Sequence, residues 1–275
     1  MVAVNPTYFE RLAARCEAAG TSLCIGLDPE PDRMPRHLPR TPEGIYRFLA
    51  EIIEATAEYA AAFKPNIAFF ESIGVEGYQV LSQSLRHVPP SIPVIIDAKR
   101  GDIGSTGRHY ARALFERLRA DAVTINPYMG SDSVKPFLER AQKAAYLLCL
   151  TSNPGAADFQ LKNDLYLRVA RKASDWNRRG NVGLVVGATQ LRFLPSIHAV
   201  APELPLLMPG VGAQGGEPER VVETLPRLAR HQMLFNVTRT VIYAGSGADF
   251  ARVARQAACE QNDRIEAARR QAPPE

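Results

Sequence analysis

Short apolar runs recur eight times along the chain, and segments with helical periodicity separate them. The runs are SLCIGLD (22–28), AAAFKPN (60–66), IPVIIDAK (92–99), DAVTINP (121–127), AAYLLCLTS (144–152), NVGLVVGAT (181–189), LPLLMPGVG (204–212) and HQMLFNV (231–237). Most of them are continuously apolar, which is typical of parallel strands buried on both faces. Eight strand and helix units in 275 residues predict an α/β protein with a single closed (β/α)8 barrel, the TIM barrel.

The alternative architecture is a doubly wound open sheet. That fold would be expected to carry a glycine-rich turn after its first strand, and CIGLDPEPD lacks one. We therefore expect one barrel domain over residues 1–275. It should begin with an amphipathic helix over about 5–19, and its C-terminal tail over about 269–275 should fray.

The composition favours an ordinary globular protein and argues against several classes of partner. Apolar residues make up 46% of the chain, and the net charge of +4 is spread along it, so neither nucleic acid nor a membrane surface is indicated. Charged residues interrupt the first twenty positions, and no apolar stretch approaches the ~20 residues that a membrane helix needs. The cysteines lie far apart, which predicts reduced thiols in a cytoplasmic protein. They are Cys16, Cys24, Cys149 and Cys259.

Charged residues stand at the ends of three consecutive predicted strands, and the active site of a barrel lies at these ends. Asp28 ends the first strand, Lys64 the second, and Asp97 and Lys99 the third. In an extended segment Asp97 and Lys99 share a face, and Asp102 follows where the chain can turn back. Each residue alone could belong to a turn or a structural ion pair. Together they favour an alternating row of acids and bases in a catalytic site.

The loops after the last two predicted strands suit a phosphate group. They read PGVGAQGGEPER and NVTRTVIYAGSG, in which glycines allow close backbone approach, Gln214 offers an amide and Arg239 a planar charged fork. After the fifth strand, Ser152 and Asn153 can form hydrogen bonds. The five histidines do not cluster at strand ends, so a Ser-His-Asp triad or a histidine-rich metal site is not expected.

The run DAKRGDI, together with FKPNIAFFE, TINPYMG, SNPGA and VGLVVGAT, resembles the orotidine 5′-phosphate decarboxylase family in its longer bacterial subgroup, from about residue 28 to 244. The resemblance implies decarboxylation of orotidine 5′-phosphate to uridine 5′-phosphate in pyrimidine biosynthesis. It implies a catalytic tetrad of Lys64, Asp97, Lys99 and Asp102, in which the Lys99 ammonium protonates C6 as CO2 leaves. No metal, flavin or pyridoxal cofactor is implied.

The resemblance also implies roles outside the tetrad. Asp28 would bind the ribose, Ser152 the pyrimidine, and Gln214 and Arg239 the phosphate. Asp102 and Thr106 would reach into the partner's site, which makes the expected enzyme a homodimer with shared active sites. Thr238 departs from the smaller residue expected before Arg239.

Two alternative functions remain open at this stage. One is a Mg²⁺-dependent sugar-phosphate lyase or decarboxylase on the same barrel, such as a hexulose-phosphate synthase, which would use its carboxylates to bind the metal. Lys64 and the form DAKRGDI favour the pyrimidine enzyme instead. The other is a non-catalytic phosphate-binding barrel with a regulatory role. Lys99 beside two acids argues against it.

Overall fold

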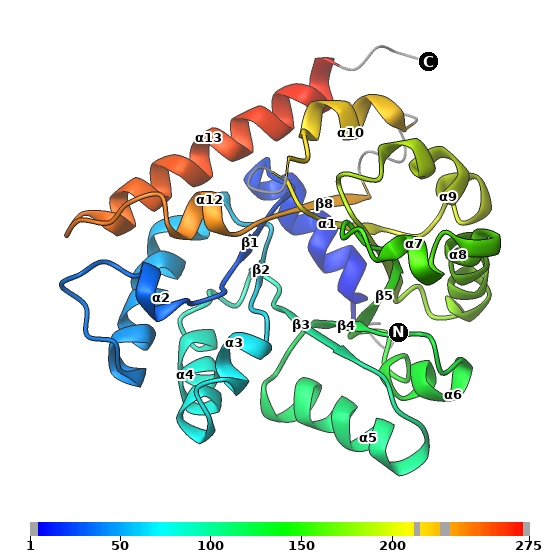
Figure 1. Ribbon diagram of the computed structural model, residues 1–275, viewed down its shortest axis with the longest axis horizontal. Helices are drawn as coiled ribbons and strands as arrows, with labels where there is room; N and C mark the ends of the chain where they lie inside the picture. Colours follow the sequence, from blue (N-terminus) through cyan, green and yellow to red (C-terminus); the bar gives the residue numbers. More distant parts are fainter. Residues whose placement is uncertain (1–4, 212–214, 226–231, 272–275) are drawn as a thin grey trace.

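The computed structural model describes residues 5–211, 215–225 and 232–271. Eight parallel strands form one sheet in the order β2-β1-β8-β7-β6-β5-β4-β3. Parallel bridges from Phe63 to Val94 and from Asn66 to Asp97 join β2 to β3 and nearly close the ring (Figure 1). The predicted barrel is confirmed, and the open sheet is wrong. The strands are β1 (Leu23–Gly26), β2 (Ala62–Lys64), β3 (Ile95–Arg100), β4 (Ala122–Ile125), β5 (Ala144–Leu150), β6 (Val182–Val186), β7 (Leu206–Pro209) and β8 (Met233–Val237).

Helices follow the strands along the chain and surround the ring (Figure 1). The longer ones are α2 (Pro42–Thr56), α4 (Val75–Leu85), α5 (Gly104–Arg112), α8 (Leu165–Trp176), α9 (Leu194–Val200), α10 (Pro218–Thr224) and α13 (Phe250–Gln271). Four short helices stand close after strand ends. They are α3 (Ala68–Glu71), α6 (Ser131–Val134), α7 (Ala156–Phe159) and α12 (Arg239–Ile242).

Helix α2 illustrates how the local sequence forms the outer layer. The Thr41 hydroxyl caps its first turn by accepting the Gly44 N–H at 3.3 Å, and Pro42 occupies the first helical position, where no N–H is needed. Apolar residues at helical spacing, including Phe48 and Ile52, are fully buried against the sheet. The large core of the protein lies in this layer between strands and helices.

Helix α1 (Tyr8–Ala19) packs Tyr8 and Leu12 into one buried cluster with residues from the first half of several strands, and so covers the amino-terminal end of the barrel. A capping box between Thr7 and Glu10 sets its start, three residues later than the predicted position of about 5. Tyr8 is fully buried, and its hydroxyl lies 3.3 Å from that of Tyr146 on β5. Because α1 fills the amino-terminal end of the barrel, a ligand cavity within the ring can open only at the carboxyl ends of the strands.

Three remaining features bear on the sequence-based expectations. Within the described parts of the chain, no helix is both long and apolar enough to cross a membrane. All four cysteines are unpaired thiols, two of them buried and two half-buried. Helix α13 continues to Gln271, so the first part of the predicted frayed tail is helical, and residues 272–275 lie outside the described residues.

Candidate active site

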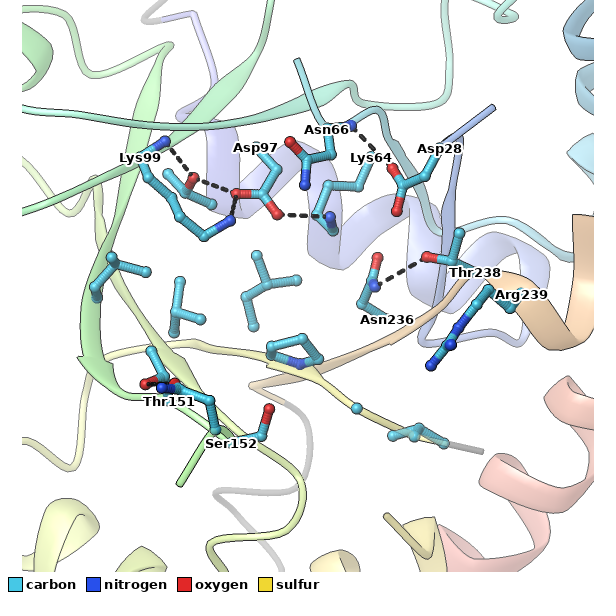
Figure 2. Close-up of a pocket in the computed structure, with 18 of the residues that line it drawn as sticks. Asp28, Lys64, Asn66, Asp97, Lys99, Thr151, Ser152, Asn236, Thr238 and Arg239 are labelled. Atoms are coloured by element: carbon cyan, nitrogen blue, oxygen red, sulfur yellow. Dashed lines mark hydrogen bonds and ion pairs between the residues drawn. The ribbon is translucent and has the colours of Figure 1, made fainter. Parts of the chain in front are cut away.

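A cavity of about 510 Å³ opens at the carboxyl ends of the strands (Figure 2). Every strand, or the loop after it, contributes to its wall. Of the residues predicted for the site, the cavity is lined by Asp28, Lys64, Asp97, Lys99, Ser152 and Arg239. Gln214 lies outside the described residues. The structure therefore brings most of the predicted site residues together around one cavity.

Asp97 on β3 stands between two lysines that differ in exposure. Lys64 Nζ, from β2, donates to Asp97 Oδ2 at 2.9 Å, and Lys99 Nζ donates to Oδ1 at 2.5 Å. The side chain of Lys64 is 4% exposed and that of Lys99 is 48% exposed. Lys64 thus acts on Asp97 from within the wall, whereas Lys99 presents its ammonium to the cavity (Figure 2).

The backbone at Lys99 corrects one sequence-based expectation. The predicted regular extended segment is wrong, because Lys99 has φ of +47°, a left-handed conformation that costs a side-chain-bearing residue ~1–3 kcal/mol. The pairing of β3 with β4 is also shifted between Ile96 and Arg100. Lys99 reaches Asp97 through this irregular turn of the strand and not through simple alternation.

The charges of this cluster stabilise one another. Burial would raise the pKa of Asp97, but the ammonium groups of Lys64 and Lys99 outweigh it and hold that pKa well below its ordinary value. Burial would lower the pKa of Lys64, but the carboxylates of Asp97 and Asp28 outweigh it and hold the pKa above its ordinary value. Asp97 and Lys64 are therefore both ionised at neutral pH.

Asp28 lies two residues beyond the end of β1, where the following loop is well anchored. Its Oδ1 accepts the backbone N–H of Asn66 at 3.0 Å, and its carbonyl accepts the Tyr243 hydroxyl at 2.9 Å. The same hydroxyl accepts the N–H of Glu30 at 2.5 Å. Burial raises the pKa of Asp28 above its ordinary value, although the ammonium of Lys64 opposes the shift. Asp28 forms the end of the predicted charged row.

The predicted pyrimidine-binding residue Ser152 lies across the cavity from the charged row, and the predicted phosphate-binding residue Arg239 lies beside Thr238, near the Asp28 end of that row (Figure 2). Thr151 and Ser152 follow β5, and Arg239 begins α12 directly after β8. Gly210 after β7 has φ of +97°, which favours glycine and lets the backbone line the cavity. Within the described parts of the chain, the exposed Arg239 guanidinium forms no ion pair with a carboxylate. The Arg239 guanidinium is therefore available to bind an anion in the cavity.

Thr238, the residue that departs from the expected pattern, is accommodated by Gly26 on β1. A Cβ at position 26 would lie 1.8 Å from the Thr238 hydroxyl oxygen, a distance that no side chain could occupy. The larger residue before Arg239 therefore fits because its neighbour on the adjacent strand has no side chain.

Asp102 and Thr106 are not brought to this cavity within the single chain. Asp102 Oδ1 accepts the neighbouring N–H of Ile103 at 2.8 Å, and Thr106 is exposed on α5. Neither lines the cavity. The two residues that the resemblance assigns to a partner's site therefore do not line the cavity of their own chain.

The sequence analysis missed the lining residues Thr124, Asn236 and Asn66, and also Tyr243, which supports the site from outside the cavity. Thr124 on β4 and Asn236 on β8 are buried polar residues in otherwise apolar strands. Asn66 follows β2, and Tyr243 anchors the loop after β1. A polar residue inside an apolar run is the only signal that could have marked the first two, and by itself it is weak.

The arrangement can bind an anionic ligand and supply a proton to it. A half-exposed ammonium faces a cavity beside a carboxylate, and a guanidinium lies across from them. Within the described residues, no three histidine, cysteine, aspartate or glutamate side chains lie close enough to hold a metal ion. Fold and site together define a (β/α)8-barrel enzyme with a lysine and aspartate cluster at the carboxyl ends of its strands.

Comparison with known proteins identifies the family within this class. The family described as "Orotidine 5′-phosphate decarboxylase / HUMPS family" matches residues 21–254, and the chain belongs to it. An orotidine 5′-phosphate decarboxylase of Roseiflexus sp. (strain RS-1) is 48% identical over 268 residues, which cover 95% of this chain and 98% of that protein. One from Azoarcus sp. (strain BH72) is 46% identical, covering 95% and 99%.

Solved structures give the same result. The structure of Leishmania donovani OMP decarboxylase superimposes with a TM-score of 0.84 at 41% identity, covering 96% of this chain and 99% of that chain. The predicted family is confirmed over nearly the whole length of the chain.

Proposed function

We propose that this chain decarboxylates orotidine 5′-phosphate to uridine 5′-phosphate, the step of pyrimidine biosynthesis that its family and its full-length relatives indicate, and that Lys99 supplies the proton. One observation carries the mechanism. The Lys99 ammonium faces the cavity while Asp97, itself held by the buried Lys64, binds it at 2.5 Å. The Mg²⁺-dependent lyase and the non-catalytic barrel are not favoured by these relatives.

The chemistry requires a cation beside the reacting carbon. When the bond from C6 to the carboxylate breaks, CO2 leaves and the electron pair stays on C6, where the ring offers no conventional acceptor. The Lys99 ammonium stabilises this charge and then transfers its proton to C6, which completes uridine 5′-phosphate. The neutral amine recovers a proton from solvent. Asp97 binds the Lys99 ammonium before the reaction and repels the substrate carboxylate, a stress that CO2 release relieves.

The remaining contacts bind the substrate at a distance from C6. Arg239, Gln214 and the loop after β7 hold the phosphate, Asp28 the ribose, and Ser152 the pyrimidine. The positions of Arg239, Asp28 and Ser152 on the cavity wall support these roles. Binding energy from the phosphate end fixes the ring against Lys99.

We also propose that no metal or organic cofactor takes part, because an ammonium beside C6 supplies the cation that the reaction needs. The test is the loss of orotidine 5′-phosphate absorbance, followed with and without prior EDTA treatment. Full activity after chelation is the expected result. Activity that EDTA abolishes and Mg²⁺ restores would favour a metal-dependent reaction, and a protein that consumes no orotidine 5′-phosphate would refute the proposed function.

A homodimer with shared sites is the second part of the proposal. Asp102 and Thr106 lie outside their own cavity, on the segment that follows β3. Adjacent loops expose three large apolar side chains, Ile103 at 52%, Tyr128 at 80% and Met129 at 50%. The N–H of Asn126 donates to the Arg100 carbonyl at 2.8 Å and joins the two loops. A second copy on this face would bury the apolar groups and bring Asp102 to the other cavity.

Mixing inactive variants tests the shared site. Asp102→Ala and Lys99→Ala subunits should each be inactive, and their heterodimer should keep one site with both groups. Random exchange of equal amounts should restore about a quarter of wild-type sites. The matched control mixes Lys99→Ala with Lys64→Ala, since both residues bind the same Asp97, and should restore nothing. No recovery in the first mixture, with exchange confirmed by mass spectrometry, would place Asp102 in its own chain's site.

Two simpler inferences accompany the function. We infer that the enzyme works in the cytoplasm, because its four cysteines are free thiols and not disulfides. We infer also that residues 1–275 act as one domain, since the strands share a single ring. Cell fractionation tests the first inference. Limited proteolysis that released a stable, folded part of the chain would contradict the second.

A further inference from the structure

The pairing between β3 and β4 contains an irregularity beside the catalytic lysine. Ile95 pairs with Ala122 and Ile96 with Val123, but the next pair is Arg100 with Ile125. Between the last two of these pairs, β3 contains residues 97–99, whereas β4 contains only Thr124. The extra residues take the backbone N–H of Lys99 away from the carbonyl that a regular ladder would give it.

The hydroxyl of Thr124 replaces the missing partner. It accepts the backbone N–H of Lys99 at 3.1 Å and donates to Asp97 Oδ1 at 2.7 Å. Thr124 is 2% exposed, so water does not easily substitute for it. A buried N–H without a partner is costly, and the hydroxyl is therefore tied to the left-handed backbone of Lys99.

One atom thus connects the backbone of Lys99 with the carboxylate that binds its ammonium. Asp97 Oδ1 accepts from both Lys99 Nζ and the Thr124 hydroxyl, and Oδ2 accepts from Lys64. The three donors hold the Asp97 carboxylate in place, and the Thr124 hydroxyl oxygen holds the backbone N–H of Lys99. Thr124 therefore restrains Lys99 at both ends, through a hydrogen bond from its backbone N–H and through the Asp97 carboxylate that binds its ammonium.

We propose that Thr124 is a positioning residue for the decarboxylation, which acts by holding Asp97 and Lys99 in the geometry that delivers the proton. The proposal rests on the proposed function of the site. Thr124 acts through these two residues and not on the substrate. It lies away from the phosphate end of the cavity, so its loss should slow the chemical step much more than it weakens binding.

Three variants separate the hydroxyl from packing. Thr124→Val removes the hydroxyl at similar volume, and Thr124→Ser keeps it while losing a buried methyl group. The control is Thr56→Val, which deletes another buried threonine hydroxyl, one that donates to the Ile52 carbonyl at 2.7 Å within α2. We expect kcat to fall about 10- to 100-fold in Thr124→Val with KM within about 3-fold, and to stay within about 3-fold of wild type in Thr124→Ser and Thr56→Val.

The results distinguish this proposal from the proposed function. A packing role alone would make Thr124→Ser at least as slow as Thr124→Val, and that outcome overturns the proposal. If Thr124→Val does not fold, Thr124→Ala also lacks the hydroxyl, and wild-type kcat in either folded variant is equally decisive. A wild-type protein that consumes no orotidine 5′-phosphate would refute the function and this role together, whereas an active wild type with an unaffected Thr124→Val refutes the role alone.

Discussion

Replacing Lys64 by methionine should destabilise the protein far more than the loss of an ion pair on the surface would. The Lys64 ammonium lies 2.9 Å from Asp97 Oδ2 inside the barrel wall. At an effective dielectric constant of about 20, this separation corresponds to about 6 kcal/mol of attraction. The desolvation cost of the lysine offsets part of it, and the carboxylates of Asp97 and Asp28 remain behind. We therefore expect a loss of about 3–5 kcal/mol at neutral pH.

The loss should also depend on pH, with a definite sign. Lys64 opposes the raised pKa of Asp28, so its removal raises that pKa further above the unfolded value of about 4. A carboxyl group with a raised folded-state pKa binds a proton more tightly when folded, so the variant gains stability as pH falls. The wild type instead loses the contribution of Asp97 only below about pH 4, because that pKa is depressed. The difference between the two proteins should shrink from pH 8 to pH 5.

Thermal unfolding at fixed protein concentration is the assay. A loss of 3–5 kcal/mol corresponds to roughly 6–20 °C for a chain of this size. The matched control is Lys172→Met, which removes an ion pair of 2.8 Å to Asp175 whose side chains are 63% and 61% exposed. It should cost less than about 1 kcal/mol. Equal losses in the two variants, or a Lys64→Met loss that grows as pH falls to 5, would refute the reasoning.

Two further predictions concern substrate binding. Arg239→Ala should raise KM about 10- to 100-fold with a smaller change in kcat, because the phosphate contact persists throughout the reaction. The control is Arg252→Ala on α13, which should change neither KM nor kcat. Unchanged kinetics in both variants would place the phosphate elsewhere. Tyr243→Phe should free the loop that carries Asp28, raise KM about 3- to 10-fold and cost about 1 kcal/mol of stability. Tyr46→Phe, which removes a hydroxyl paired with a surface histidine, is its control, and equal KM values in the two tyrosine variants would contradict the role of Tyr243.

The fold could be predicted because burial on both faces leaves a direct mark in the sequence. Each of the eight apolar runs overlaps one strand, and each strand is shorter than its run, although β3 extends one residue past its run to Arg100. The first run reaches Asp28, for example, whereas β1 ends at Gly26. An apolar run reports that residues are buried. Whether they join a ladder depends on a neighbouring strand that lies elsewhere in the sequence.

The charged row could be predicted for a similar reason, since parallel strands bring their carboxyl ends to one rim. The conformation of Lys99 could not. Alternation assumes a regular strand, and β3 departs from one both in the left-handed backbone of Lys99 and in its shifted pairing with β4. Thr124 was missed because its importance comes from that same pairing. The roles proposed for Asp102 and Thr106 require a second chain, about which the periodicity of one sequence contains no information.

The central claim is that the Lys99 ammonium protonates C6, and chemical restoration of that ammonium tests it most directly. Lys99→Cys should lose at least about 10⁴-fold in kcat while still binding uridine 5′-phosphate. Alkylation with 2-bromoethylamine converts the cysteine into a near-isostere of lysine, and it should recover at least about 100-fold of the lost activity. Wild-type protein treated in the same way controls for the four native thiols. Wild-type turnover by Lys99→Cys, or no recovery when mass spectrometry shows full modification at position 99, would contradict the claim.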